Sequence, residues 1–426
     1  MGMTLFFTLW FVFLVFGMPI FFSLGLISLA YLMSHHEILL SVPQRLTMTA
    51  DSFPLLAAPF FILMGNLMNT SGVTRRIFNF ANCLVGHIRG GLGHANVVAS
   101  MIFAGMSGAA VADAAGLGTI EIEAMKEGGY DVDFACAITA ASSTIGPIIP
   151  PSLPMIIYGV LANTSVGGLF IGGIVPGVLM GFSLMLYVYL FARNKNYPRR
   201  TFPTIKNFLA ALQEAFLSLL TPVILLGGIF SGVFTPTEAA AVAAFYALLL
   251  GMYYREIKIS DLPDIILNTI ETNAVIIALV MTASLFGWVI TRAQVPQMMG
   301  KLLIDISDNP LVILLILDLF LLFVGCFMEA IAAQMILIPI LLPVVLRLGI
   351  SPIHFGLVMI LNLMIGTLTP PIGVVLYVTA KVADISFERV TKATFPFLVP
   401  LLIVLLLITL FPALTTFLPS VILGIE

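Results

Sequence analysis

The stretch "TIGPIIPPS", from Thr144 to Ser152, decides how this chain can fold. It lies inside an apolar run, Phe134 to Val160, that is long enough to cross a membrane. Proline lacks a backbone N–H and clashes with the carbonyl one turn earlier, so this stretch must interrupt a helix. Each unsatisfied backbone group in lipid costs several kcal/mol. The free backbone groups at the interruption therefore need hydrogen-bond partners inside the protein or a functional role.

The composition limits the class of protein. The chain has 426 residues, of which 60% are apolar and 9% are charged. This indicates an integral membrane protein with little soluble mass. The apolar runs are continuous and do not alternate with polar residues, which predicts an all-α fold. The sequence has no phosphate-binding GxxxxGK[ST] loop, so ATP is not expected to drive the protein, and no nucleic-acid partner is predicted.

Apolar windows of about 20 residues mark candidate membrane spans. The candidates are Leu5–Leu32, Ser52–Met68, Phe134–Val160, Gly167–Phe191, Ala215–Gly232, Ala239–Tyr254, Ile265–Ile290, Leu311–Val324, Ile353–Ala380 and Phe395–Leu418. Two further segments are apolar but interrupted near the middle: "GLGHANVVASMIFAGMSGAAVADAAGLGTIEIEAM" and "ILDLFLLFVGCFMEAIAAQMILIPILLPVVL". We predict that both are helical hairpins that enter the membrane and turn back.

The two halves of the chain superpose without gaps after a shift of 220 residues, for example from Gly105 to Gly325. The same shift carries Gly146 onto Gly366 and one Pro-Pro pair, Pro150–Pro151, onto the other, Pro370–Pro371. Internal repeats of this kind are the first feature to seek in a sequence. We interpret the chain as two repeats, residues 1–202 and 221–426, joined by an interfacial helix at residues 203–220.

The distribution of charge predicts that the repeats are inverted. The loop "RNKNYPRRTFPTIK" after Phe191 is basic, whereas the end of the chain, "PSVILGIE", has no Lys or Arg. The positive-inside rule places the loop in the cytoplasm and allows the C-terminus outside. Inverted repeats are the plan of many secondary transporters.

A span interrupted at "GPIIPPS" gives two half-helices. The first ends in free carbonyls, which suit Na⁺, and the second starts with free N–H groups, which suit a carboxylate. A proline kink without any ligand is the alternative. The equivalent stretch "GTLTPPIG" at Gly366–Gly373 favours the first interpretation.

The hairpin tips supply candidate ligands. In "GMSGAA", Gly105 and Gly108 permit close backbone approach and Ser107 offers a hydroxyl, although a small-residue helix contact is the alternative. The tip "GCFME" has no hydroxyl, so an ion there depends on carbonyls, on Thr369 and on Glu329. Glu329 is a carboxyl in apolar surroundings and is a functional candidate, with a structural pair as the alternative.

Other polar residues near these stretches are weaker candidates. Asp113 follows the first tip by about one turn and either supports an ion site or caps backbone. Residues that precede the interruptions could face a cavity, although Ser and Thr in helices usually bond their own backbone. These residues are Ser142, Ser143, Thr144 and Asn362. Glu238 in "TPTEAAA" is interpreted as a charge at a helix N-terminus.

The chain resembles the large membrane subunit of tripartite ATP-independent periplasmic (TRAP) transporters. The resemblance covers the whole chain, and its most specific pieces are "GMSGAAVADAAGLGT", "GPIIPPS", "GVFTPTEAAA" and "GTLTPPIGVVLY". It implies an elevator-type transporter in the bacterial inner membrane, driven by a Na⁺ gradient. It also implies a small membrane subunit, expected here as a separate chain, and a periplasmic binding protein. The implied substrates are organic acids of the sialic acid or C4-dicarboxylate class.

The resemblance also implies the site residues. One Na⁺ site would use Gly105, Ser107, Gly108, Gly146, Ile149 and Ser152. The other would use Gly325, Met328, Gly366, Thr369 and Ile372, with Met328 contributing only its carbonyl. Substrate contacts are expected from Ser142, Ser143, Thr144, Pro150, Pro151, Pro370 and Pro371. Asp113, Glu329 and Asn362 are expected to support the ion sites from behind the ligands.

Two other classes remain as alternatives. A channel would use the irregular loops to line a continuous pore. A membrane-embedded hydrolase would need a nucleophile and a base, and the sequence contains no Ser/His or metal-binding cluster. The chain is therefore expected to be a transporter subunit rather than an enzyme.

Overall fold

The computed structural model describes residues 2–193, 195 and 197–425, with only the backbone described at position 304. All regular secondary structure in these residues is helical, as predicted. Seven helices are long and apolar enough to cross a membrane, which indicates a multi-pass membrane protein. These candidate spans are Phe53–Thr70, Val166–Ala192, Ile205–Phe230, Pro236–Tyr253, Ile259–Arg292, Ala330–Arg347 and Phe387–Leu410.

The first predicted span, Leu5–Leu32, is wrong as a single helix. The structure has two short helices here, α1 (Met3–Val15) and α2 (Ile20–Ser34). Gly17 adopts a left-handed conformation (φ +76°), and Pro19 precedes α2 as its N-cap, so the chain turns between them. The two helices pack together through Phe6 and Tyr31, whose ring centroids lie 5.7 Å apart.

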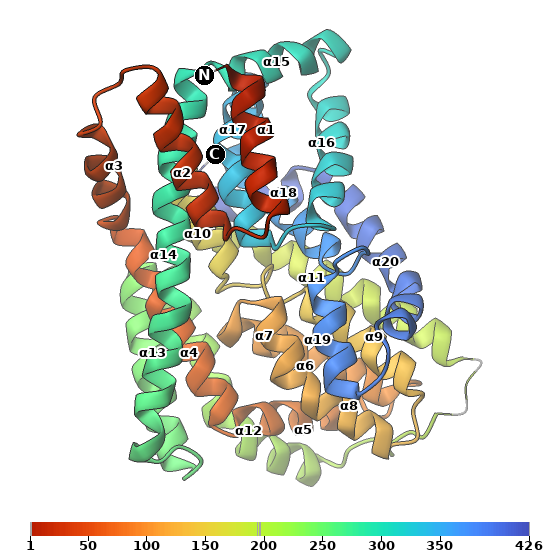
Figure 1. Cartoon of the computed structure of the whole chain (residues 1–426). Helices are drawn as coiled ribbons and strands as arrows, with labels where there is room; N and C mark the ends of the chain where they lie inside the picture. Colours follow the sequence, from red (N-terminus) through yellow and green to blue (C-terminus); the bar gives the residue numbers. More distant parts are fainter. Residues whose placement is uncertain (1, 194, 196, 426) are drawn as a thin grey trace.

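A group of long helices stands to one side of the molecule (Figure 1). It contains α2, α3 (Ser41–Ala50), η1 (Phe53–Leu56), α4 (Ala57–Thr70), α13 (Pro236–Tyr253), η2 (Ile259–Asp261) and α14 (Leu262–Arg292). Within it, α4 packs on α13 and α2 packs on α14. Thr235 and Glu238 form a capping box at the start of α13, which confirms the interpretation of Glu238 as a helix N-terminal charge.

The expected separate helix at residues 203–220 does not occur. The structure instead has one continuous helix, α12 (Ile205–Phe230), which joins that segment to the next predicted span. Thr204 caps its start, and the helix continues through Pro222 to Phe230. Pro222 lies inside the helix and packs directly against Gly105, where an added Cβ would lie 2.7 Å from the Pro222 Cβ.

The two predicted hairpins are present as helix–turn–helix units. Hairpin 1 contains α6 (Gly91–Ser107), α7 (Ala110–Ala115) and α8 (Leu117–Glu127). Hairpin 2 contains α16 (Pro310–Gly325) and α17 (Ala330–Arg347). Figure 1 shows hairpin 1 in the lower half of the molecule and hairpin 2 in the upper half.

The two interrupted helices are also present. In the first, α9 (Val132–Ser143) and α10 (Leu153–Leu161) are separated by residues 144–152, which we call break 1. In the second, α18 (Pro352–Gly366) and α19 (Val374–Ala383) are separated by residues 367–373, which we call break 2. The Pro–Pro peptide bond in each break is cis.

The element order follows the 220-residue shift. Helices α7 and α17 begin at Ala110 and Ala330, and α9 and α18 begin at Val132 and Pro352. Each interrupted helix is followed by a long one, α11 (Val166–Ala192) or α20 (Phe387–Leu410). The short helices α5 (Val73–Val85) and α15 (Val295–Ile306) lie at the lower and upper ends of the molecule (Figure 1). The final helix is α21 (Ala413–Leu423).

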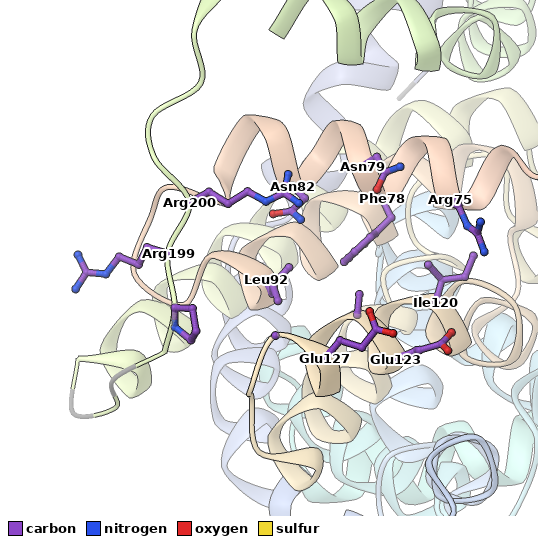
Figure 2. A pocket seen from close by; sticks show the side chains of 14 residues that line it. Arg75, Phe78, Asn79, Asn82, Leu92, Ile120, Glu123, Glu127, Arg199 and Arg200 are labelled. Carbon is purple, nitrogen blue, oxygen red and sulfur yellow. The ribbon is translucent and has the colours of Figure 1, made fainter. Parts of the chain in front are cut away.

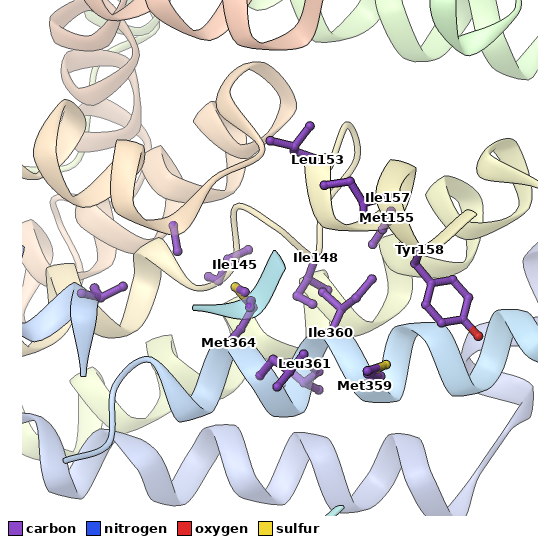
Figure 3. Close-up of a cluster of buried hydrophobic side chains, with 14 of the residues drawn as sticks. Ile145, Ile148, Leu153, Met155, Ile157, Tyr158, Met359, Ile360, Leu361 and Met364 are labelled. Atoms are coloured by element: carbon purple, nitrogen blue, oxygen red, sulfur yellow. The ribbon is translucent and has the colours of Figure 1, made fainter. Parts of the chain in front are cut away.

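The core lies where the two halves meet. Apolar side chains of break 1 and α10, including Ile148 and Met155, pack against Ile360 and Leu361 of α18 (Figure 3). The Tyr158 hydroxyl of α10 donates to the carbonyl of Pro352, 2.7 Å away, at the start of α18. The two breaks are therefore held in one packed unit.

Candidate functional site

The tip of hairpin 1 contacts break 1 through backbone. The N–H of Leu153 donates to the carbonyl of Gly108, with the two atoms 3.4 Å apart. A Cβ on Gly108 would lie 2.6 Å from the carbonyl oxygen of Pro151, and Gly108 also has a φ of +65°. Only glycine meets both conditions without strain.

The tip of hairpin 2 contacts break 2 in a similar way. The N–H of Ile372 donates to the carbonyl of Cys326 at 3.2 Å. A Cβ on Gly366 would lie 2.5 Å from the Cα of Gly325, so the two glycine backbones touch. Each hairpin tip thus closes on the break in its own half of the chain.

The hydrogen-bonding oxygen atoms at these two contacts belong to carbonyls and hydroxyls. At break 1, the Ser152 hydroxyl donates to the Pro147 carbonyl at 2.6 Å and accepts from the N–H of Met155. At break 2, the Thr369 hydroxyl donates to the Ile365 carbonyl at 3.1 Å. Within the described part of the chain, no group of three or more His, Cys, Asp or Glu side chains could hold a metal ion. Carbonyl and hydroxyl oxygens at half-helix ends suit a weakly bound cation such as Na⁺ better than a transition metal.

The residues predicted for the first ion site lie together around the contact between the tip of hairpin 1 and break 1. Gly105 lies near break 1, because a Cβ on it would be 3.9 Å from the Pro150 carbonyl oxygen. Gly146 lies against the Asp113 carboxyl of α7. The Ser107 hydroxyl lies within 3.4 Å of the N–H of Ala109. The side chain of Ile149, in contrast, packs toward Gly177 of α11, so only its backbone is available to the tip.

The residues predicted for the second ion site also meet. Gly325, Gly366 and Ile372 take part in the backbone contacts described above. The N–H of Met328 donates to the Val324 carbonyl at 3.1 Å, so Met328 is held in the turn of hairpin 2. Thr369 lies in break 2 and is half-buried.

The three predicted supporting residues have different roles. Asp113 is 2% exposed and adjoins break 1 at Gly146. Glu329 caps α17: its carboxylate accepts from the N–H groups of Ile331 and Ala332 at 2.9 and 3.2 Å. This N-cap is a role that neither sequence interpretation of Glu329 included. Asn362 donates to the carboxyl of Asp318 in hairpin 2.

The predicted substrate-facing residues divide into two groups. Ser142, Ser143 and Thr144 are buried, and the Ser143 and Thr144 hydroxyls donate to carbonyls of their own helix. Ser142 donates to Asn96 of α6, so it faces hairpin 1. Among the prolines, Pro150 and Pro151 are buried, Pro370 is half-buried and Pro371 is exposed.

Two polar networks behind the breaks were missed from the sequence. In the first, Asn96 and Ser100 of α6 bond Ser142 of α9, and Asn96 also bonds Thr139 at 2.7 Å. The second joins Asp318, Asn362 and Thr409. Asp318 had a usable signal, because it is the only charged residue in an otherwise apolar helix.

A polar cleft of about 570 Å³ lies between α5 and the α8 end of hairpin 1, beside the contact of α5 with α6 (Figure 2). Arg75 of α5 and Arg200 line it, and Glu123 and Glu127 of α8 approach it from the hairpin side. The N–H of Arg200 bonds the Gly86 carbonyl at 3.1 Å, which fixes the loop against the end of α5. One edge of the contact between hairpin 1 and α5 is therefore charged and accessible, whereas α6 and α5 pack together elsewhere.

The basic loop after α11 is tied to the start of α9. Lys195 donates to the carboxylate of Asp131 at 2.8 Å, and the Tyr197 hydroxyl donates to the same oxygen at 2.9 Å. These two donors hold the pKa of Asp131 below its usual range. The carboxylate is therefore ionised at neutral pH and keeps the loop against the helix.

Hairpins that close on interrupted helices are features of membrane transport proteins. Residues 7–414 match the family model described as the DctM component of tripartite ATP-independent periplasmic transporters. The chain is 50% identical over 410 residues to the sialic acid TRAP transporter large permease protein SiaM of Vibrio cholerae, covering 96% of each chain. It therefore belongs to the TRAP large permease (DctM) family, as the sequence motifs indicated.

Other relatives are named for sialic acid or for C4-dicarboxylates. The chain is 44% identical to the sialic acid TRAP transporter permease protein SiaT of Haemophilus influenzae, covering 96% of this chain and 67% of that one. It is 41% identical to the C4-dicarboxylate TRAP transporter large permease protein DctM of Pseudomonas aeruginosa, covering 93% and 94%. These relatives are transporter subunits, which agrees with the expectation of a non-enzyme.

The fold resembles that of a solved transporter. The crystal structure of the YdaH transporter of Alcanivorax borkumensis matches with a TM-score of 0.65, at 14% identity, over 88% of this chain and 87% of that one. At this identity the likeness concerns the fold alone.

The contact between the Gly325 and Gly366 backbones generates a stability prediction. In Gly366→Ala the new methyl meets the hairpin backbone, and overpacking of this kind costs about 1–3 kcal/mol. We expect a lower unfolding temperature for the purified protein in detergent. Gly227→Ala in α12 is the matched control, because a Cβ there meets nothing within 4 Å. Equal unfolding temperatures for the two variants would contradict the close contact.

Proposed function

We propose that the chain is the translocation subunit of a Na⁺-coupled TRAP secondary transporter that imports an organic acid across the bacterial inner membrane. The observation that carries the proposal is the closure of each hairpin tip on the break in its own half, at neutral oxygens. Membership of the family supplies the transport class. A coupling ion held only by carbonyls and hydroxyls can be released in every cycle.

Each of the two contacts would hold one Na⁺. Site 1 combines Gly105, Ser107 and Gly108 with Gly146, Ile149 and Ser152, and site 2 combines Gly325 and Met328 with Gly366, Thr369 and Ile372. The C-terminal ends of α9 and α18 point into these sites with a partial negative charge. The starts of α10 and α19 have the opposite polarity, and the substrate carboxylate would bind there beside the Pro-Pro pairs.

The repeats would have opposite orientations in the membrane. This is supported by the positions of hairpins 1 and 2 in opposite halves of the molecule (Figure 1) and by the basic loop after α11. In an elevator mechanism, the hairpins and interrupted helices would move together against the group of α2, α4, α13 and α14.

Sialic acid is the substrate we propose first, with C4-dicarboxylates second. The support is the 50% and 44% identity to two sialic acid permeases, against 41% to a C4-dicarboxylate permease. The partners would be a small TRAP membrane subunit and a periplasmic binding protein that delivers the acid. The family description, a tripartite transporter, supports both partners.

The inverted arrangement predicts which side of the membrane each loop faces. A cysteine at Arg199 should react with a membrane-impermeant maleimide only from the cytoplasm, and one at Ser420 only from the periplasm. Labelling of whole cells and of inside-out vesicles, in a background without the three native cysteines, measures this. Reaction of both positions from one side would exclude inverted repeats.

Reconstitution tests the transport proposal. In proteoliposomes that contain the chain, its small subunit and the binding protein, uptake of labelled sialic acid should require an inward Na⁺ gradient and should saturate. Omission of the binding protein should reduce uptake at micromolar substrate. Uptake that continues without Na⁺, or conduction that never saturates, would favour a channel instead.

Substitution of Thr369 tests the second Na⁺ site. Thr369→Val keeps the shape and removes one oxygen, and loss of one ligand to a charged group costs roughly 1.5–3 kcal/mol. The Na⁺ concentration for half-maximal uptake should rise roughly 10- to 150-fold. Ser107→Ala should act similarly at the first site. Initial uptake rates against Na⁺ concentration, at matched protein levels, measure both effects.

Thr367→Val is the matched control. The Thr367 hydroxyl also bonds a carbonyl of its own helix, that of Met364, but it is buried two residues before Thr369. Its loss should leave the Na⁺ dependence unchanged. If Thr369→Val and Ser107→Ala behave like this control, the breaks are structural and the ion-site assignment fails.

A further inference from the structure

Asp318 is a buried carboxyl in the middle of hairpin 2. It is the only charged residue of α16, "PLVILLILDLFLLFVG", and it is 6% exposed. Neither the predicted ion sites nor the predicted substrate contacts include it. A buried carboxylate is costly unless it is paired or neutralised. The question is what compensates its charge.

The neighbours of Asp318 offer hydrogen bonds but no positive charge. Its Oδ1 accepts from the Asn362 amide of α18 at 2.7 Å, and its Oδ2 lies 2.8 Å from the Thr409 hydroxyl of α20. The described residues contain three ion pairs, and none involves Asp318. A pair of neutral donors compensates an ionised carboxylate only in part.

The titratable groups on the helices that pack against α16 lie at other levels. They are His354 on α18, two turns before Asn362; Glu329 and Arg347 at the two ends of α17; and Glu388, Arg389 and Lys392 in the first turns of α20. Glu329 already caps its own helix, and Arg389 pairs with Asp133. None of these groups provides a counter-ion for Asp318.

The number of hydrogens at Thr409 indicates how the negative charge of Asp318 is neutralised. The Thr409 hydroxyl lies 2.8 Å from Asp318 Oδ2 and 3.0 Å from the Leu405 carbonyl oxygen. A hydroxyl has one hydrogen, so it can make a full hydrogen bond to only one of these two acceptors at a time. If Oδ2 carries a proton, Asp318 donates to Thr409 and Thr409 donates to Leu405, and each contact then has one hydrogen. The Asn362 amide has two hydrogens, which serve Asp318 Oδ1 and the Val358 carbonyl.

We propose that Asp318 is a proton-binding site and carries its proton on Oδ2 in this state of the protein. The ligand is a proton taken from water, which forms an O–H bond and leaves the carboxyl neutral. The alternative, an ionised carboxylate that binds a metal cation, leaves the second hydrogen-bond contact at Thr409 without a hydrogen.

A cavity gives water a route to this site. About 740 Å³ of space lies between the start of α16, the α17–α18 turn and the α20–α21 turn. Its polar lining consists of Asn309, Ser351, His354, Thr409, Thr416 and Ser420. Among the described residues, Ser351 Oγ and His354 Nε2 have no hydrogen-bond partner although both atoms are buried. Such atoms usually bond ordered water, and Thr409 connects this lining to Asp318.

Infrared difference spectroscopy of the purified full-length protein tests the proposal without a transport assay. A protonated carboxylic acid has a C=O stretch that is distinct from the carboxylate bands and shifts in D2O. We expect the Asp318→Asn variant to lack one such band at pH 7. The pKa of an aspartic acid free in water is about 4, so such a group would show only carboxylate bands at this pH. Asp308→Asn is the matched control, because Asp308 is exposed just before the same helix. It should change only carboxylate bands.

Thr409→Val provides the second variant. It removes the acceptor of the proposed Asp318 O–H, so the same band should remain but shift in frequency. If Asp318→Asn removes no protonated-acid band, the proposal is overturned. The same follows if it removes a carboxylate band that responds to Na⁺, because Asp318 is then an ionised cation ligand. Either result leaves the proposed transport function standing, since uptake is measured separately.

Discussion

The structure depends on one constraint: a backbone that leaves the helical conformation at membrane depth must find partners inside the protein. Breaks 1 and 2 would otherwise expose free carbonyl and N–H groups to lipid. Each is instead covered by the tip of the hairpin that precedes it in the chain, through a direct N–H to carbonyl bond. The close approach requires glycine at Gly108 and Gly366. The same closure gathers neutral oxygens into two small sites, so the structural solution and the candidate chemistry share the same atoms.

The breaks are positioned by polar contacts one turn behind them. In the first half, Asn96 and Ser100 of α6 hold Ser142 of α9. In the second half, Asp318 of α16 holds Asn362 of α18. Ser142 and Asn362 are related by the 220-residue shift, so the same position anchors the interrupted helix to its hairpin in both halves. These bonds are buried, where hydrogen bonds are strong and unpaired groups are costly.

The sequence predicted those features that depend on the residues of one short segment. Gly and Pro fix the two breaks, and "GMSGAA" and "GCFME" fix the two turns, because these residues restrict the backbone wherever they occur. The sequence analysis failed where the outcome depends on neighbours. Pro19 lies between two helices as the N-cap of α2, whereas α12 continues through Pro222. The cap role of Glu329 and the bond between Asp318 and Asn362 join residues whose contact only the tertiary structure defines.

The two halves differ in charge although they share a plan. The 220-residue shift carries Val98 onto Asp318, so an apolar side chain in hairpin 1 corresponds to a carboxyl in hairpin 2. Asn362, which bonds that carboxyl, lies one turn before Gly366 of the proposed second Na⁺ site. A proton on Asp318 leaves this position uncharged in both halves, and its release places a negative charge near the second site only. Under both proposals, a proton at Asp318 and Na⁺ at the second site therefore weaken each other's binding by the same factor. The first site, whose supporting network is Asn96, Ser100 and Ser142, has no such coupling to a proton at this position.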